Sequence, residues 1–139
     1  MSDLKTRISV ELENIDLILA ELPQAKDLPG LSRLELAGTA ALVHNFYSGI
    51  ESIIKQILLS KDVSVAEGGS WHKELIETAA KNGLISESTR NALGQYLSFR
   101  HFFVHAYALE LYADRMEPLV GGVVPLYDSF KKDISPFLI

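Results

Sequence analysis

The amino-acid sequence predicts an all-α fold, an up-and-down bundle of four to five helices. Apolar residues recur at steps of three and four over several long stretches, which is the period of a helix with one buried face. Cap-forming residues precede these stretches, and Pro or Gly follows them. No alternating apolar and polar run lies between hairpin turns, so we expect no sheet.

The first helix is expected to extend to about Leu22. The Ser2-Asp3 pair offers a side-chain oxygen for its N-cap. Pro23, followed by the segment Leu28-Pro29-Gly30, ends it. Its buried face consists of Leu4, Ile8, Leu12, Ile15, Leu19 and Leu22.

A second, long helix begins at Ser32 and is expected to form the centre of the bundle. Glu35 stands three residues after Ser32, which is the spacing of a capping box. Residues 60–70 break the helical period and are expected to form a loop. The apolar positions of this helix are Leu36, Ala40, Val43, Phe46, Ile50, Ile53, Ile54, Ile57 and Leu58.

A short third helix is expected from Trp71 to about Lys81, where Asn82-Gly83 ends it. A fourth begins at Ser86 and continues through Tyr107.

A fifth helix is expected from about Asp114 to Lys132. Pro118 suits its first turn, whereas Gly121-Gly122 and Pro125 predict a weak or kinked middle.

Composition limits the class of protein. With 139 residues, the chain is expected to form a single domain over residues 1–139. The absence of cysteine excludes thiol nucleophiles, zinc–thiolate sites and iron–sulfur clusters. No apolar run reaches the roughly 20 residues of a membrane span, and no basic, apolar signal peptide opens the chain. We therefore expect a cytoplasmic protein with no membrane partner.

The net charge of −5 argues against binding of nucleic acid by bulk electrostatic attraction. If the protein acts on a nucleic acid, it must do so through a local site.

One segment does not fit a plain bundle. Residues 96–109 contain no acid and are apolar nearly all round the helix, so this helix is expected to be buried or covered by a partner. Arg100 nevertheless lies on its apolar stripe, with no carboxylate three or four residues away. Because an unpaired buried cation costs on the order of a few kcal/mol, another group must supply the anion. The stripe consists of Leu93, Tyr96, Leu97, Arg100, Phe103, Val104 and Tyr107.

Two sources of this anion are open. One is a carboxylate from another helix, for which Glu51 on the second helix is the best candidate; this would be a structural ion pair. The other is a ligand phosphate, which arginine binds through a bidentate fork.

His105 favours the phosphate. A histidine can take a proton from a ribose 2′-hydroxyl or donate one to a leaving 5′-oxygen, while an arginine stabilises the charge on the phosphate. His105 lies about 140° round an ideal helix from Arg100, so the two meet at one phosphate only if the helix bends or a second copy of the chain contributes. A composite site in a homodimer meets this requirement. Such a site cleaves RNA but not DNA, with no metal ion or cofactor.

The same residues allow two other interpretations. His101 and His105 have a spacing that can bind zinc, but the further ligands would have to come from His44, His72 or a distant carboxylate, so no metal site is expected. Trp71 is expected in the core.

Arg100, His105 and Tyr107 form an Arg-x4-His-x-Tyr motif that resembles the motif of HEPN-superfamily ribonucleases, in their HepT-like toxin branch. The resemblance extends to residues 44–51 (His-Asn-Phe-Tyr-Ser-Gly-Ile-Glu) and 71–75 (Trp-His-Lys-Glu-Leu). It implies a HEPN-like helical homodimer that cleaves RNA without a metal ion, as the toxin of a HepT/MntA-type toxin–antitoxin system. Arg100 would orient and stabilise the scissile phosphate, and His105 would be the acid–base residue.

The resemblance also implies a protein partner. In this branch an MntA-like minimal nucleotidyltransferase antitoxin silences the toxin by transferring AMP to the motif tyrosine, which is Tyr107 here. Arg100 and Tyr107 share a helix face, so the added phosphate would lie near the arginine. His101, Glu51 and Tyr47 are auxiliary candidates; Tyr47 and Glu51 lie one turn apart, and Glu51 would tune the site if it faces Arg100.

Two competing functions stay open at this point. The chain could be a non-catalytic substrate-binding or adaptor subunit of a nucleotidyltransferase, with Arg100 binding a nucleotide or holding a dimer. It could also be a purely structural dimer, in which Arg100 and Glu51 pair across helices.

Overall fold

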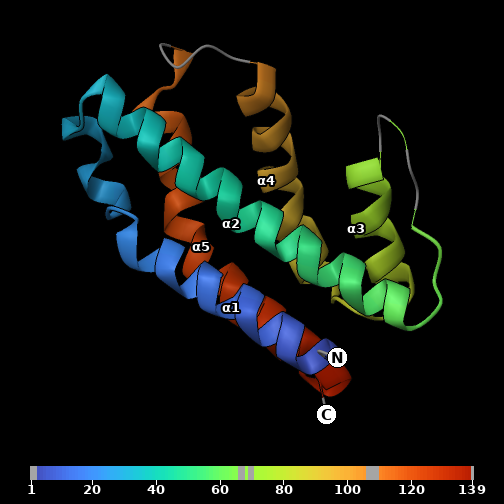
Figure 1. The fold of residues 1–139 in the computed structure, drawn as a ribbon. Coiled ribbons are helices and arrows are strands. Elements are labelled where there is room, and N and C mark those ends of the chain that lie inside the picture. The colour runs from blue at the N-terminus through green and yellow to red at the C-terminus, as the bar shows by residue number, and fades with distance from the viewer. Residues whose placement is uncertain (1–2, 66–67, 69–70, 106–109, 139) are drawn as a thin grey trace.

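The chain folds into α-helices that pack around one long central helix (Figure 1). The structure is a computed structural model that describes residues 3–65, 68, 71–105 and 110–138. No strand occurs among these residues, which confirms the predicted all-α bundle. The α-helices are α1 (Leu4–Glu21), α2 (Arg33–Ser60), α3 (Trp71–Lys81), α4 (Glu87–His105) and α5 (Ala113–Ile134); the described part also contains the 3-10 helices η1 (Ala25–Gly30) and η3 (Ser135–Leu138).

Helix α2 is the centre of the bundle, as the sequence predicts. It contacts α1, α3, α4 and α5. In Figure 1, α1 runs along one side of α2, and α3 and α4 lie on the other. Its apolar positions are buried nearly all along its length, from Leu36 to Leu58. Residues of α2 can therefore contribute to sites formed with any of these neighbours.

Local side-chain caps fix where the helices begin. Asp3 Oδ1 accepts a hydrogen bond from the Thr6 amide at 2.7 Å, and α1 starts at the next residue. Ser32 and Glu35 form the predicted capping box, with reciprocal bonds of 3.1 Å and 2.9 Å. At α4, the Thr89 amide donates to Ser86 Oγ at 3.1 Å. The predicted starts of these three helices are confirmed.

Helix α5 is continuous where the sequence predicts a weak or kinked middle, and Pro118 lies in its second turn rather than its first. The reason is packing. A Cβ at Gly122 would come within 3.0 Å of the Tyr96 hydroxyl, which donates to the Leu119 carbonyl at 2.5 Å. The glycine lets α4 approach α5 closely, and these tertiary contacts outweigh its poor helix propensity.

Two other expected features differ in extent. The segment after Pro23 contains η1, which packs against α5 and buries Leu28. The fourth helix is expected through Tyr107; α4 is described to His105, and residues 106–109 lie outside the described part.

None of the helices in the described part of the chain combines the length and the apolar character that a membrane span requires.

Candidate functional site

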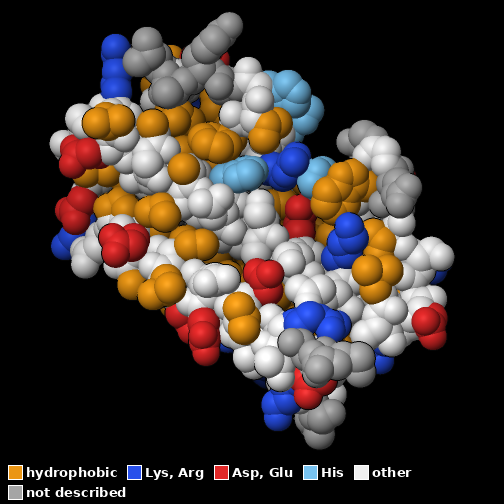
Figure 2. All heavy atoms as spheres, viewed as in Figure 1, with side chains coloured by type: hydrophobic (Ala, Val, Ile, Leu, Met, Phe, Trp, Pro, Cys, Tyr) orange, Lys and Arg blue, Asp and Glu red, His pale blue; other side chains and the backbone are white. Residues whose placement is uncertain are grey.

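A groove of about 330 Å³ lies between α2, α3 and α4. The three helices contact one another pairwise, so each contributes one wall. On the face shown in Figure 2, histidine side chains gather with basic and acidic side chains in one region. The groove is lined by Ser48, Glu51, Ser52, Lys55, Trp71, His72 and Arg100. It thus contains two of the residues singled out in the sequence, Arg100 and Glu51.

Arg100 reaches this groove from α4 and is half-buried. Among the described residues it makes no hydrogen bond and no ion pair. Its nitrogens are also not among the buried polar atoms that lack a partner, so the guanidinium is open to the groove. The first of the two anion sources, an ion pair with Glu51, is therefore not what the described structure contains.

Glu51 pairs with His72 instead. His72 Nδ1 lies 2.9 Å from Glu51 Oε2 and 3.0 Å from Oε1, and the two side chains are only 14% and 6% exposed. An ionised carboxylate can only accept, so Nδ1 carries the proton. This arrangement fixes the ring orientation and leaves Nε2 as the free nitrogen. Nε2 is not among the buried unpartnered atoms of the described residues, so it too is open.

Trp71 lines the groove and is half-buried rather than part of the core. Its ring contacts the ring of His72 at a centroid separation of 3.6 Å and a tilt of 33°, and Lys55 Nζ lies 5.6 Å from the Trp71 centroid. The indole thus contacts the imidazole on one side. Lys55, on α2, places a positive charge near the same indole ring.

Tyr47 and His44 lie on α2 next to the groove. The Tyr47 hydroxyl and His44 Nε2 are buried and have no hydrogen-bond partner in the described part of the chain. Burial, then the charge of Glu51, raises the pKa of Tyr47. Burial, then the charge of Arg100, lowers the pKa of His44, whose ring packs on Phe103 at 5.2 Å. Both side chains are therefore neutral at pH 7 and make poor proton carriers.

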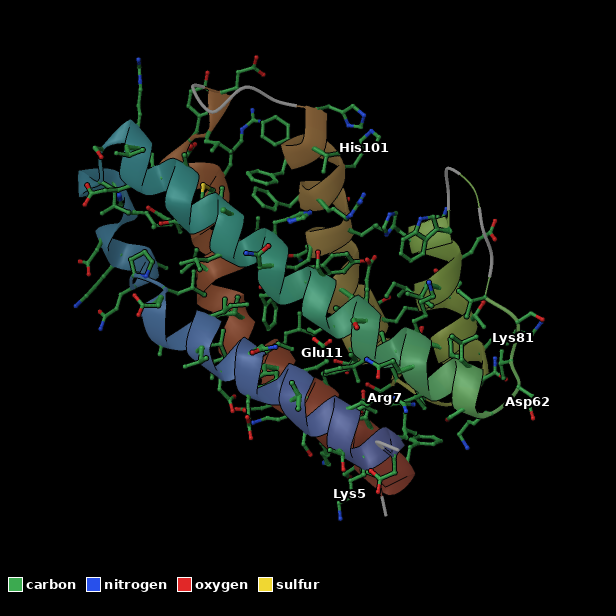
Figure 3. All side chains as sticks on the ribbon, viewed as in Figure 1. Lys5, Arg7, Glu11, Asp62, Lys81 and His101 are labelled. Carbon is green, nitrogen blue, oxygen red and sulfur yellow. The ribbon has the colours of Figure 1, made fainter. Side chains whose placement is uncertain are left out.

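His101 and His105 lie at the exposed end of α4. Their ring centroids are 4.9 Å apart, and His105 Nδ1 donates to the His101 carbonyl at 2.8 Å, which leaves His105 Nε2 free. In Figure 3, His101 projects from the last turns of α4 to the outside of the bundle. His105 does not line the groove that contains Arg100, and no hydrogen bond joins the two side chains within the described part of the chain. Tyr107 lies outside the described residues.

Within the described part of the chain, no three His, Asp or Glu side chains are grouped so that they could hold a metal ion.

Sequence reasoning missed the roles of His72 and Lys55. In the sequence His72 stands out only as a possible further metal ligand and as part of the 71–75 segment that resembles the HepT-like branch. Its position after Trp71 at the start of a helix is visible in the sequence, but the partner Glu51 is 21 residues away, and only the docking of α3 on α2 brings the two together.

Comparison with known proteins identifies the family. The family described as "HepT-like protein" matches residues 38–139, from the first turns of α2 to the end of the chain. No curated protein and no solved structure matches the chain. The chain therefore belongs to the HepT-like family of HEPN-type proteins, as the resemblance of its motif indicates.

Proposed function

We propose that this chain, a member of the HepT-like family, is the toxin of a toxin–antitoxin pair and a metal-independent endoribonuclease. The observation that carries the proposal is the guanidinium of Arg100, a half-buried cation that faces a groove and makes no ion pair with a described residue. An unpaired cation in such a place lowers stability, so it is best explained by an anion that binds there. The oxygens of an RNA phosphate match its planar fork.

The chemistry follows from two residues. Arg100 binds the scissile phosphate and stabilises its charge as the ribose 2′-oxygen attacks phosphorus and the bond to the 5′-oxygen breaks. His105, with a free Nε2, exchanges the proton that one of these oxygens gains or loses. The products are a 2′,3′-cyclic phosphate and a 5′-hydroxyl.

A homodimer would bring together an arginine and a histidine at one phosphate, although Arg100 and His105 lie about 140° apart round one ideal helix. Phe102 and Val104, which flank the motif on α4, are 38% and 48% exposed. Large apolar side chains around two exposed histidines favour a partner that covers this face, and a second copy of the chain would bring a second motif to it. Arg100 of one copy and His105 of the other would then share one phosphate.

Silencing by an MntA-like nucleotidyltransferase antitoxin is part of the proposal. AMP transferred to the phenol of Tyr107, seven residues after Arg100 in the sequence, would add a phosphate of the kind that the guanidinium binds. Mass spectrometry after co-expression with a nucleotidyltransferase from the neighbouring gene should locate AMP on Tyr107. A silenced toxin that carries no AMP would contradict this step.

End-group analysis of RNA treated with the purified protein tests the nuclease. We expect 2′,3′-cyclic phosphate ends in the presence of a chelator, and loss of cleavage by roughly 100-fold or more in Arg100→Ala and His105→Ala. Arg90→Ala is the matched control, because Arg90 lies on the same helix and pairs with Glu77 at 3.2 Å, outside the groove.

Undiminished cleavage by Arg100→Ala and His105→Ala would contradict the site. Intact RNA, together with a nucleotide that binds in an Arg100-dependent manner, would instead support the adaptor function.

A further inference from the structure

We infer that His72, held by Glu51, is a second acid–base residue of this site, the base that removes the 2′-hydroxyl proton. The inference rests on the proposed ribonuclease function and adds a residue that lies outside the Arg-x4-His-x-Tyr motif.

The pair has the geometry of an oriented base. Both carboxylate oxygens of Glu51 lie within 3.0 Å of His72 Nδ1, and the Trp71 ring packs against the imidazole, tilted by 33°, with a centroid separation of 3.6 Å. The ring is therefore fixed in orientation and tautomer, with the lone pair on Nε2. A carboxylate on Nδ1 also stabilises the imidazolium that forms when Nε2 takes a proton.

The pair also stands where the reaction is proposed to occur. His72 lines the same groove as Arg100, so a phosphate bound by the guanidinium lies within one small groove with Nε2. Lys55 adds a further positive charge from α2. By contrast, His105 lies at the exposed end of α4 and is not among the described residues that line this groove.

Stability alone does not explain the pair. Removing the Glu51 carboxylate from water offsets much of what its hydrogen bond with His72 contributes, so a buried pair of this kind contributes little to stability compared with apolar residues of similar size. A purely structural pair also does not explain why His72 Nε2 makes no hydrogen bond with a described residue in a groove that Arg100 lines as well.

The reaction balances with two histidines. His72 Nε2 takes the proton of the 2′-hydroxyl while the 2′-oxygen forms a bond to phosphorus. The bond from phosphorus to the 5′-oxygen breaks, and the imidazolium form of His105 donates a proton to that oxygen. His72 then loses its proton to solvent and His105 regains one, so that no oxidant, metal ion or co-reactant is needed.

Two substrates separate the two roles. One is RNA, and the other is a ribonucleoside 3′-(4-nitrophenyl) phosphate, whose leaving group departs without a proton. The main variant is His72→Asn, because the asparagine amide takes the place of Nδ1 and keeps a donor to Glu51 but cannot act as a base. Glu51→Gln is the second variant, and Lys73→Ala, an exposed neighbour on α3, is the control.

We expect His72→Asn to lower kcat by roughly 100-fold or more on both substrates, with KM near the wild-type value. Glu51→Gln should lower kcat on both as well. His105→Ala should lose cleavage of RNA and keep cleavage of the nitrophenyl ester, which needs no acid. Thermal unfolding checks that each variant is folded.

Wild-type kcat in folded His72→Asn, with Arg100→Ala still inactive, would overturn this inference and leave the proposed function standing. If His72→Asn does not fold, wild-type kcat in Glu51→Gln would overturn it equally. A wild-type protein that cleaves neither substrate would overturn both.

Discussion

Replacing Arg100 by Met tests whether the chain itself satisfies this cation. Met keeps an unbranched apolar stem in the groove wall and removes the guanidinium. If Arg100 were half of an internal ion pair, its loss would leave an unpaired buried carboxylate and cost about 3–5 kcal/mol. In the described structure the nearby carboxylate of Glu51 is bound to His72 at 2.9 Å, so no such charge is left behind.

We therefore expect Arg100→Met to change the free energy of unfolding by less than about 1 kcal/mol, while cleavage of RNA is lost. For a chain of this length, 1 kcal/mol corresponds to a shift in Tm of roughly 3 °C. Glu51→Gln is the matched comparison, because it weakens a charge-assisted hydrogen bond that the structure does contain and should cost about 1.5–3 kcal/mol.

Thermal unfolding followed by circular dichroism, at neutral pH and low salt, measures both variants. A loss of more than about 3 kcal/mol in Arg100→Met would refute the reasoning, because Arg100 would then have an internal partner. Equal Tm shifts in the two variants would refute it as well, since the Glu51 carboxylate would then bind Arg100 as well as His72.

Three further predictions use other parts of the molecule. Mixing Arg100→Ala with His105→Ala protein should restore roughly a quarter of wild-type RNA cleavage, because half of the dimers are mixed and each of these has one complete composite site; no recovery would mean that one chain supplies both residues. Tyr107→Phe should keep cleavage but become resistant to the nucleotidyltransferase, which a growth assay with both genes measures; continued silencing would exclude AMP on this phenol. His44→Phe should raise stability by about 1 kcal/mol at pH 7 by removing a buried nitrogen without a partner while keeping the contact with Phe103. Because the folded pKa of His44 is lowered, the unfolded chain binds more protons, so wild-type stability should fall as pH drops below about 6.5 and this part of the loss should vanish in His44→Phe; an unchanged pH dependence of Tm would contradict it.

The helix boundaries that depend on capping residues and on the hydrophobic period could be predicted from the sequence. The long second helix begins at Arg33, directly after the capping residue Ser32, and the third runs from Trp71 to Lys81, as expected. Hydrophobic period and caps act within one turn, so a sequence reports them directly. The continuity of α5 was missed because its glycines have a tertiary purpose: Gly122 makes room for the Tyr96 hydroxyl, which lies on another helix. From the local sequence these glycines predict a break in the helix. Once the position of α4 is known, Gly122 indicates close packing instead.

The candidate site divides in the same way. Arg100 could be singled out because the sequence alone shows that no acidic residue lies three or four positions from it on its own helix. The Glu51–His72 pair could not, because its two members come from α2 and α3 and meet only through the angle at which these helices pack. His105 and Tyr107 stay predictions about function, the first at the exposed end of α4 and the second beyond the described residues.

The position of α3 also explains how Arg100 stays open. Glu51 and Arg100 line the same groove, and a carboxylate beside an arginine would both pair with it and repel a phosphate. His72 Nδ1 lies within hydrogen-bond distance of both oxygens of that carboxylate, so the carboxylate already has a hydrogen-bond donor before a ligand arrives. Helix α3 is therefore more than a cover for the apolar face of α2. By bringing His72 to Glu51 it gives this carboxylate a partner other than Arg100, and under the proposed function this leaves the guanidinium of α4 open to an incoming phosphate.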